Sequence, residues 1–233
     1  MAGAQTIAVW TLLLLACGSL FYWAVVLYRV VITVIQLPTG RDGVVLADGD
    51  HRESATRSTA VVVPAHNEQG VIGELIASLR SQDHPDFIVV LALDRCTDDT
   101  ARVAREAIDG DERFEIVEIG ACPPGWAGKV HAVYDALQRS MRAADAELLV
   151  FVDADCTFAP TCLRAAAALL ADRGLHLLSL LNTLTSDRWF EWFVQPMAGF
   201  ELMRQYPLTR VNRAGPRQRA FANGQFLMFD AEA

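Results

Sequence analysis

Residues 148–155 read LLVFVDAD, an apolar run that stops at two acidic residues. A short apolar run that ends at polar residues predicts a strand over residues 148–152 that is buried on both faces. Side chains alternate along a strand, so Asp153 and Asp155 leave its end on the same side. Two carboxylates at this spacing repel each other unless a cation lies between or beside them. A cation site at the end of a buried strand is therefore expected, the alternative being a solvated loop that happens to hold two acids.

Apolar runs and helical spacings alternate on either side of this strand. The predicted strands are residues 59–63, 87–93, 114–119 and 148–152, and the predicted helices are residues 71–79, 98–107 and 129–144. Strands that are apolar throughout are typical of a parallel sheet covered on both faces. The predicted fold class is therefore α/β, a mostly parallel sheet with helices on both faces. Ligands of such sheets bind beyond the carboxyl ends of the strands.

Polar residues follow two more of the predicted strands. Residues 64–68 read PAHNE after the first strand, and residues 94–100 read DRCTDDT after the second. Each of these motifs is weak alone, but three polar strand ends at one edge of one sheet indicate a site.

The acidic pair favours a hard metal ion. Carboxylate oxygens without a His or Cys cluster suit Mg²⁺ or Mn²⁺ better than Zn²⁺, and such ions take further ligands from substrate phosphates and water. A rival interpretation starts from residues 153–157, which match the D-x-D-x-T box of haloacid-dehalogenase-type phosphatases. Those enzymes need a lysine and an acidic pair downstream, whereas the only lysine here is Lys129, upstream.

Lys129 is the single lysine among 20 basic residues. An ammonium group is a compact point charge, suited to a phosphate, whereas guanidinium is a planar fork. Chance within a composition biased toward arginine is an equally open explanation.

The first 37 residues predict a membrane anchor. Residues 7–28 carry no charge, and at about 1.5 Å per residue they span roughly 33 Å, enough for the hydrocarbon core. A cleaved signal peptide is disfavoured because no basic residue precedes Trp10, and the apolar stretch runs far beyond Cys17. The nearby arginines all follow the span, so the positive-inside rule predicts a single-pass anchor in the cell membrane with a cytoplasmic body.

Composition limits the remaining possibilities. The chain is 52% hydrophobic with a net charge of −8, which excludes a disordered chain and disfavours nucleic-acid binding. Its five cysteines contain no C-x-x-C pair, which argues against a disulfide framework. The expected segments are a transmembrane anchor at 1–37, a polar linker at 38–57 and an α/β domain at 58–233.

Residues 189–206 combine a broad apolar aromatic face with a following basic stretch. After Glu201 the arginines are Arg204, Arg210, Arg213, Arg217 and Arg219, with no acid among them. This pattern is typical of a helix at an anionic membrane surface. An ordinary core helix, kinked at Pro196, is the alternative.

Together these motifs resemble the family 2 glycosyltransferases, which have the GT-A fold (nucleotide-diphospho-sugar transferase, Rossmann-like). Residues 64–68 look like the family's opening P-A-x-N-E, residues 93–100 align with its D-D-G-S-T-D-G-T, and Asp153 and Asp155 fall on its D-x-D motif. The anchor, GWAGK at 125–129 and NGQFL at 223–227 look most like the hopanoid-associated and carotenoid-type members. The resemblance covers about residues 59–233.

The chain departs from the family pattern in two ways. Leu93 replaces the first Asp of the nucleotide motif, and Arg95 and Cys96 replace Gly-Ser. The family's general-base carboxylate follows the strand that matches residues 224–229, so a C-terminally truncated domain without that base is expected.

The resemblance implies inverting transfer of a sugar from a nucleoside-diphosphate donor to an acceptor hydroxyl. If residues 189–206 lie at the membrane surface, the expected acceptor is lipid-like. Asp153 and Asp155 would hold Mg²⁺ or Mn²⁺, and Lys129 would add positive charge beside the leaving diphosphate. The substrate-binding residues it implies are Pro64, His66, Asn67, Glu68, Asp94, Trp126 and Lys129. A truncated remnant that at most binds nucleotide sugar is the alternative. A sugar nucleotidyltransferase is disfavoured because residues 64–70 lack a Gly-rich basic loop.

Overall fold

The structure is a computed structural model of the 233-residue chain, and it describes residues 2–183, 185, 188–211 and 221–232. The chain divides into two compact units. One, called the helical unit, comprises residues 1–37 and 186–221, and the other, called the body, comprises residues 38–185 and 222–233. Arg213, Arg217 and Arg219 of the predicted basic stretch lie outside the described residues.

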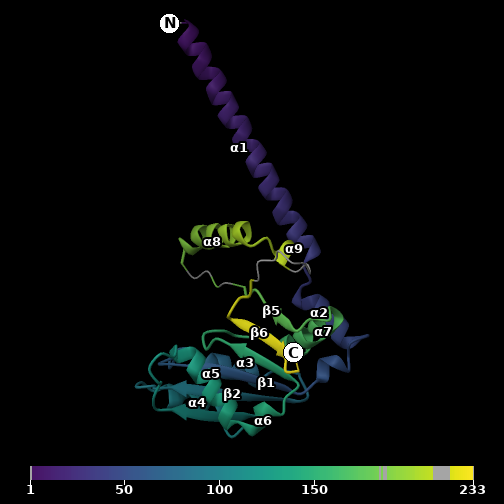
Figure 1. The fold of residues 1–233 in the computed structure, drawn as a ribbon, viewed down its shortest axis with the longest axis vertical. Helices are drawn as coiled ribbons and strands as arrows, with labels where there is room; N and C mark the ends of the chain where they lie inside the picture. Colours follow the sequence, from purple (N-terminus) through teal and green to yellow (C-terminus); the bar gives the residue numbers. More distant parts are fainter. Residues whose placement is uncertain (1, 184, 186–187, 212–220, 233) are drawn as a thin grey trace. The chain divides into compact units, whose positions relative to one another are not determined.

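The body is built on a six-stranded sheet with the order β3-β2-β1-β4-β6-β5 (Figure 1). The strands are β1 (Thr59–Ala65), β2 (Phe87–Asp94), β3 (Phe114–Ile119), β4 (Leu148–Val152), β5 (Leu177–Ser179) and β6 (Phe226–Asp230). Strand β1 runs parallel to β2 and β4, β2 runs parallel to β3, and β6 is antiparallel to β4 and β5. The mostly parallel α/β sheet is confirmed.

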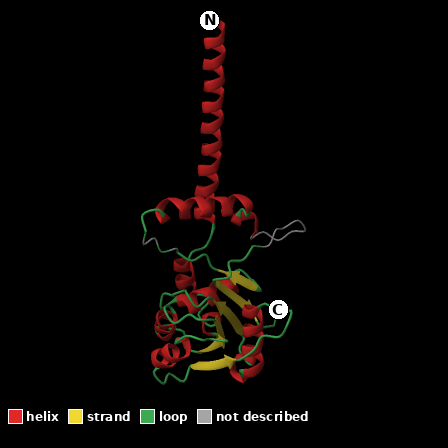
Figure 2. Ribbon diagram, turned by 90° about the vertical axis from the view of Figure 1, so that its left-hand side faces the viewer, coloured by secondary structure: helices red, strands yellow, loops and turns green. Residues whose placement is uncertain are grey.

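Helices cover both faces of this sheet (Figure 2). The helices of the body are α2 (Gly40–Asp48), α3 (Ile72–Arg80), α4 (Thr100–Ile108), α5 (Gly128–Arg139), α6 (Met141–Ala144) and α7 (Cys162–Asp172). Alternate residues of β1 explain the two layers: Val61 and Val63 pack with α3, α4 and α7, while Val62 packs with α5 and α6. Both faces of the strand are buried, which is why its sequence is apolar throughout.

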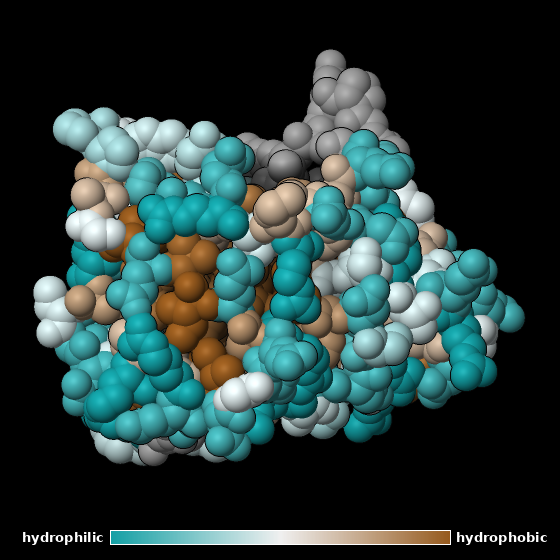
Figure 3. All heavy atoms as spheres, turned by 90° about the horizontal axis from the view of Figure 1, so that it is seen from below, coloured by the Kyte–Doolittle hydropathy of each residue, from teal (hydrophilic) through white to brown (hydrophobic). Residues whose placement is uncertain are grey.

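Strand β3 forms one edge of the sheet. Its Phe114 and Ile116 are half-buried. Seen from below, the body is mostly polar, and apolar atoms show in a strip framed by polar side chains (Figure 3).

The predicted helix over residues 129–144 is interrupted. Ser140 lies between α5 and α6, and its hydroxyl accepts a hydrogen bond from the Ala143 N–H at 3.2 Å. The same hydroxyl donates to Glu115 on β3 at 2.7 Å. Serine is a favoured N-cap residue, so a new helix begins after Ser140, although the apolar spacing of the sequence predicts one continuous helix.

The prediction of a linker over residues 38–57 is wrong. Residues 40–48 form α2, which begins with a capping box between Thr39 and Asp42, and η1 (Ser54–Thr56) follows it. Ala47 and Ala55 are buried against Ala168 of α7. Arg164 of α7 holds this segment with a further ion pair to Asp48 at 2.6 Å. The polar residues that suggested a linker are thus cap and surface residues of a packed helix.

Helix α2 lies so close to α7 that the backbone at Gly43 contacts the backbone at Ala165. A Cβ at Gly43 would lie 2.5 Å from the carbonyl oxygen of Ala165, closer than real Cβ contacts allow. Glycine is therefore required at this position by space, although its backbone angles are ordinary helical ones.

We predict that Gly43→Ala weakens the docking of α2. The added methyl group meets backbone atoms, which cannot move aside as a side chain would, so the cost should be about 1–3 kcal/mol. Hydrogen exchange of the α2 amides should become faster. Gly40→Ala is the matched control, because nothing lies within 4 Å of a Cβ at Gly40. Equal α2 protection in the two variants would contradict the packing argument.

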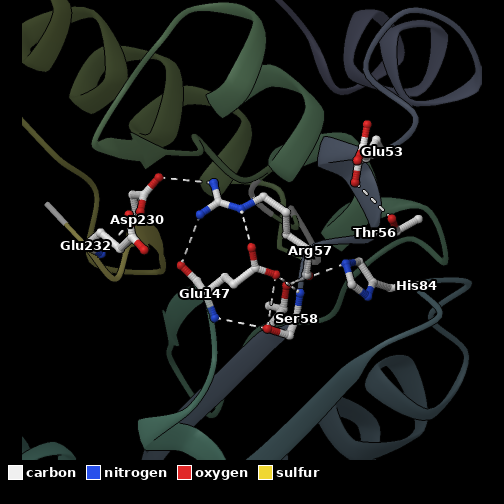
Figure 4. A network of polar contacts seen from close by, with 9 residues as sticks. Glu53, Thr56, Arg57, Ser58, His84, Glu147, Asp230 and Glu232 are labelled. Carbon is white, nitrogen blue, oxygen red and sulfur yellow. Dashed lines mark hydrogen bonds and ion pairs between the residues drawn. The ribbon is translucent and has the colours of Figure 1, made fainter.

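A polar network joins the starts of β1 and β4 to the end of β6 (Figure 4). Arg57 donates to Asp230 at 3.0 Å and pairs with Glu147, whose carboxylate also accepts from the Ser58 N–H at 3.0 Å. The bond from Arg57 holds the pKa of Asp230 below its ordinary value, and the bond from Ser58 does the same for the pKa of Glu147. These charged bonds fix the antiparallel strand β6 to the parallel part of the sheet.

The helical unit contains α1 (Ala2–Gln36), α8 (Glu191–Gln205) and α9 (Leu208–Val211). By length and composition alone, the N-terminal helix is long and apolar enough to cross a membrane. Helix α8 continues through Pro196 and contains no buried residue. It contacts α1 through Phe200, whose ring centroid lies 6.0 Å from that of Trp23. An ordinary core helix would bury one face, so the core alternative for α8 is not supported.

Candidate active site

A cleft of about 290 Å³ opens at the carboxyl ends of β1, β2 and β4. Its walls come from all three polar strand ends that the sequence singles out and from the first turns of α5. The lining residues are Pro64, Ala65, His66, Glu68, Asp94, Lys129, Ala132, Asp153, Ala154 and Asp155. The prediction that these strand ends form one cleft is confirmed by this geometry, although the roles of the individual residues are not tested by it.

Strand β6 fixes the turn that carries the two acids. The backbone N–H of Asp153 donates to the carbonyl oxygen of Gln225 at 3.4 Å, and the N–H of Cys156 donates to the carbonyl oxygen of Asp153 at 3.4 Å. Asn223, two residues before Gln225, is held in turn by its side-chain amide, which donates to the carbonyl oxygen of Leu180 at 3.3 Å. The NGQFL motif therefore lies directly beside the acidic pair, 70 residues later in the sequence.

Lys129 supplies the positive charge beside the acidic pair. It lies in the first turn of α5, and its ammonium group forms an ion pair with the carboxylate of Asp153. The N-cap residue Ala127 makes no side-chain capping bond. Asp155 is exposed, and among the described residues no cation pairs with it.

Hydrogen bonds join the loop after β1 to the loop after β2. Asn67, which has a left-handed φ of 58°, accepts from the Thr97 N–H at 2.8 Å. The Thr100 hydroxyl accepts from the Glu68 N–H at 2.8 Å and donates to Asp98 at 2.5 Å. Asn67 was expected to bind substrate, but it does not line the cleft. In the structure it holds the two loops together.

His66 also bridges these loops. Its Nδ1 lies 2.5 Å from the carbonyl oxygen of Asp94, so this nitrogen carries the proton and donates. The ring lines the cleft, which leaves Nε2 as the nitrogen able to meet a ligand.

Asp94 is held by its neighbour in the chain. Arg95 donates from Nε and Nη2 to the two carboxylate oxygens of Asp94 at 2.9 and 2.8 Å. Arg95 has a left-handed φ of 48°, and a Cβ at Gly128 would lie 2.9 Å from its Nη2. The fork is therefore possible because of a backbone conformation on one element and a missing Cβ on another.

This fork governs the charge of Asp94. The carboxylate side chain is only 5% exposed, yet the hydrogen bonds from Arg95 hold its pKa below the ordinary value despite burial. Asp94 is thus kept ionised and in one orientation at the cleft wall. In the sequence, Arg95 is only a departure from the family pattern, and no local signal predicts its bond to Asp94.

Trp126 lies outside the cleft lining. Its ring is 45% exposed and contacts two residues of α5, with centroid distances of 5.6 Å to His131 and 5.2 Å to Tyr134. The structure thus gives Trp126 a packing contact on α5, and its predicted role beside the substrate stays a prediction.

The donor atoms of the cleft fit a hard divalent ion better than a soft one. Asp153 and Asp155 offer carboxylate oxygens only, and burial raises the pKa of the nearby Cys156 thiol to about 11, so it stays neutral. Within the described residues no group of three His, Cys, Asp or Glu side chains could hold a metal by itself. An ion here would therefore need ligands from water and from a bound phosphate, as Mg²⁺ and Mn²⁺ accept.

We predict that Arg95→Gln raises the pKa of Asp94. The substitution removes both charged hydrogen bonds but leaves the burial that disfavours the carboxylate. Carbon NMR of the aspartate carboxyl groups should show the Asp94 midpoint moving to higher pH. Arg102→Gln is the control, because Arg102 pairs with Asp99 and Glu106 on α4. A midpoint that stays in place in Arg95→Gln would contradict the account.

Part of the chain is similar in sequence to known glycosyltransferases. A stretch of 102 residues is 36% identical to the 4,4'-diaponeurosporenoate glycosyltransferase of Staphylococcus aureus strain bovine RF122 / ET3-1. The match covers 44% of this chain and 25% of the relative, so it spans about a quarter of that protein's length. The protein of the same name from strain USA300 is 35% identical over 102 residues, with the same two coverages.

The fold also matches a solved glycosyltransferase. The mannosyltransferase PcManGT from Pyrobaculum calidifontis superposes with a TM-score of 0.56 at 20% identity, over 82% of this chain and 55% of that one. At this identity the likeness shows the fold alone, and it confirms the GT-A fold predicted from the motifs. The sequence pattern of glycosyl transferase family 2 matches residues 60–233, three quarters of the chain. The chain therefore belongs to glycosyl transferase family 2.

Proposed function

We propose that this protein is a membrane-anchored, inverting glycosyltransferase. It moves a sugar from a nucleoside-diphosphate donor to a lipid-like acceptor, and it depends on Mg²⁺ or Mn²⁺. One observation carries the proposal: a single cleft at the carboxyl edge of the sheet gathers Asp94, Lys129, Asp153 and Asp155. Donors of this kind carry a diphosphate, which needs positive charge around it, and a polar nucleoside, whose hydroxyl and N–H groups need hydrogen-bond acceptors.

Names of similar proteins support the same chemistry. The Staphylococcus aureus relatives are named for glycosyl transfer to 4,4'-diaponeurosporenoate, and PcManGT is described in complex with GDP-Man and Mn²⁺. We infer a nucleotide-sugar donor for this chain on that basis together with its own cleft. The sugar and the base stay unassigned.

Asp153 and Asp155 are the residues that would hold the metal. When bound, Mg²⁺ or Mn²⁺ supplies positive charge against the leaving diphosphate. Lys129 adds a second positive charge at the same wall, and its ion pair with Asp153 shows that its ammonium reaches the acidic pair.

Other lining residues of the same cleft would bind the nucleoside. Asp94 is ionised and fixed by Arg95, so it presents acceptor oxygens to hydroxyl or N–H groups. His66 and Glu68 line the same cleft, with His66 oriented through its Nδ1. Pro64, near the end of β1, also lines it.

Membrane attachment would come from α1, with the body on the cytoplasmic side. The basis is the uncharged run of residues 7–28 and the arginines that follow it. Helix α8 exposes Trp192, Phe193 and Met197, each about 70% exposed, which suits contact with the bilayer interface. A lipid-like acceptor could reach the enzyme from there.

We predict that Lys129→Ala lowers turnover of a nucleotide-sugar donor by about 100-fold, because a preorganised charge beside the leaving group is lost. Lys129→Arg should restore part of the rate. Donor hydrolysis in the presence of Mn²⁺ is the measurement, and the secondary structure should be unchanged by circular dichroism. Arg142→Ala is the control, since it removes one exposed charge outside the cleft.

Two results would count against the proposal. Unchanged turnover in Lys129→Ala would remove Lys129 from the mechanism. Binding of nucleotide by the unaltered chain without any turnover would favour the alternative of a non-catalytic remnant.

A further inference from the structure

A second groove lies within the helical unit. It measures about 220 Å³ and runs between the C-terminal half of α1 and the α8–α9 segment. Its apolar wall includes Val26, Val30, Phe200 and Met203, and both Arg29 and Arg204 line it. The groove thus combines an apolar floor with two guanidinium groups.

The two arginines differ in how they are neutralised. Arg204 donates from Nε and Nη2 to the carboxylate of Glu201, at 2.7 and 2.6 Å. Arg29 is exposed, and no carboxylate in the described part of the chain pairs with it. Helix α1 itself contains no acidic residue. Arg29 therefore has no counter-ion in the described part of the chain and is available to an external anion.

The charge of the chain is divided unevenly between its two units. Residues 1–37 and 186–221 together contain seven arginines and three acidic residues, although the whole chain carries a net charge of −8. The apolar unit is thus the basic one. An apolar and basic surface is complementary to an anionic lipid, whereas an acidic protein partner would not need the apolar floor.

The position of Arg29 fixes the depth of the site. It follows directly after the uncharged run of residues 7–28, so in a membrane it would lie where the hydrocarbon ends and the phosphates begin. Trp23, one turn and a half earlier, contacts Phe200 of α8. An aromatic pair at this level is typical of the membrane interface.

We propose that this groove binds one anionic phospholipid, with the phosphate between Arg29 and Arg204 and an acyl chain on the apolar wall. The guanidinium fork of Arg29 suits bidentate contact with a phosphate. Glu201 competes with the phosphate for Arg204 and so limits the affinity. The inference rests on the proposed membrane attachment of α1 and adds a specific lipid site to it.

The test uses the full chain in a neutral detergent, titrated with phosphatidylglycerol or phosphatidylcholine and observed by native mass spectrometry. At about 1 kcal/mol per arginine near a phosphate, Arg29→Gln should weaken phosphatidylglycerol binding about fivefold and leave phosphatidylcholine binding unchanged. Glu201→Gln should strengthen phosphatidylglycerol binding, because Arg204 is released. Arg41→Gln in α2 is the control, since Arg41 does not line the groove.

Equal affinity of the unaltered chain for the two lipids would overturn the inference, as would equal effects of Arg29→Gln and Arg41→Gln. Weaker phosphatidylglycerol binding in Glu201→Gln would also contradict it. Membrane attachment is measured separately, by sedimentation of the chain with membranes after an alkaline wash. A chain that stays with the membrane but shows no lipid preference would leave the proposed function standing and remove only this site.

Discussion

Repulsion between two carboxylates at the end of a buried strand is the constraint on which the site depends. Strand β4 carries no charge until Asp153, and Asp155 follows within the same turn. Such a pair requires a positive charge nearby. In the structure Lys129, the only lysine of the chain, provides it from the first turn of α5.

The same logic applies to Asp94 in the same cleft. Asp94 is nearly buried and pairs with Arg95, just as Asp153 pairs with Lys129. These two carboxylates of the cleft therefore each have a cation from the chain itself, whereas Asp155 has none among the described residues. A divalent ion would bring positive charge to Asp153, and a diphosphate would bring negative charge to Lys129. Binding of the ion and the diphosphate together should therefore be favoured over binding of either one alone. Arg95 has a different role, because it fixes Asp94 from outside the cleft lining.

Much of this arrangement could be predicted from the sequence because local patterns determine it. Strands β3 and β4 have the predicted bounds, and the polar residues after β1, β2 and β4 meet because parallel strands end at one edge. The fork from Arg95 could not be predicted, since it depends on a left-handed backbone angle and on the missing Cβ of Gly128. Residues 38–57 were mistaken for a linker because their order depends on the contact of Gly43 with Ala165, more than 100 residues away.

The central claim is that Asp153 and Asp155 bind a divalent ion together with a diphosphate. Electron paramagnetic resonance of Mn²⁺, titrated into the chain with and without UDP or GDP, measures this directly. Because this pair supplies only two carboxylates, weak Mn²⁺ binding is expected for the chain alone and much tighter binding with one of these nucleotides. The gain should be lost in Asp155→Asn but kept in Asp145→Asn, since Asp145 is an exposed residue at the end of α6 that does not line the cleft. Tight Mn²⁺ binding without nucleotide, or an undiminished gain in Asp155→Asn, would contradict it.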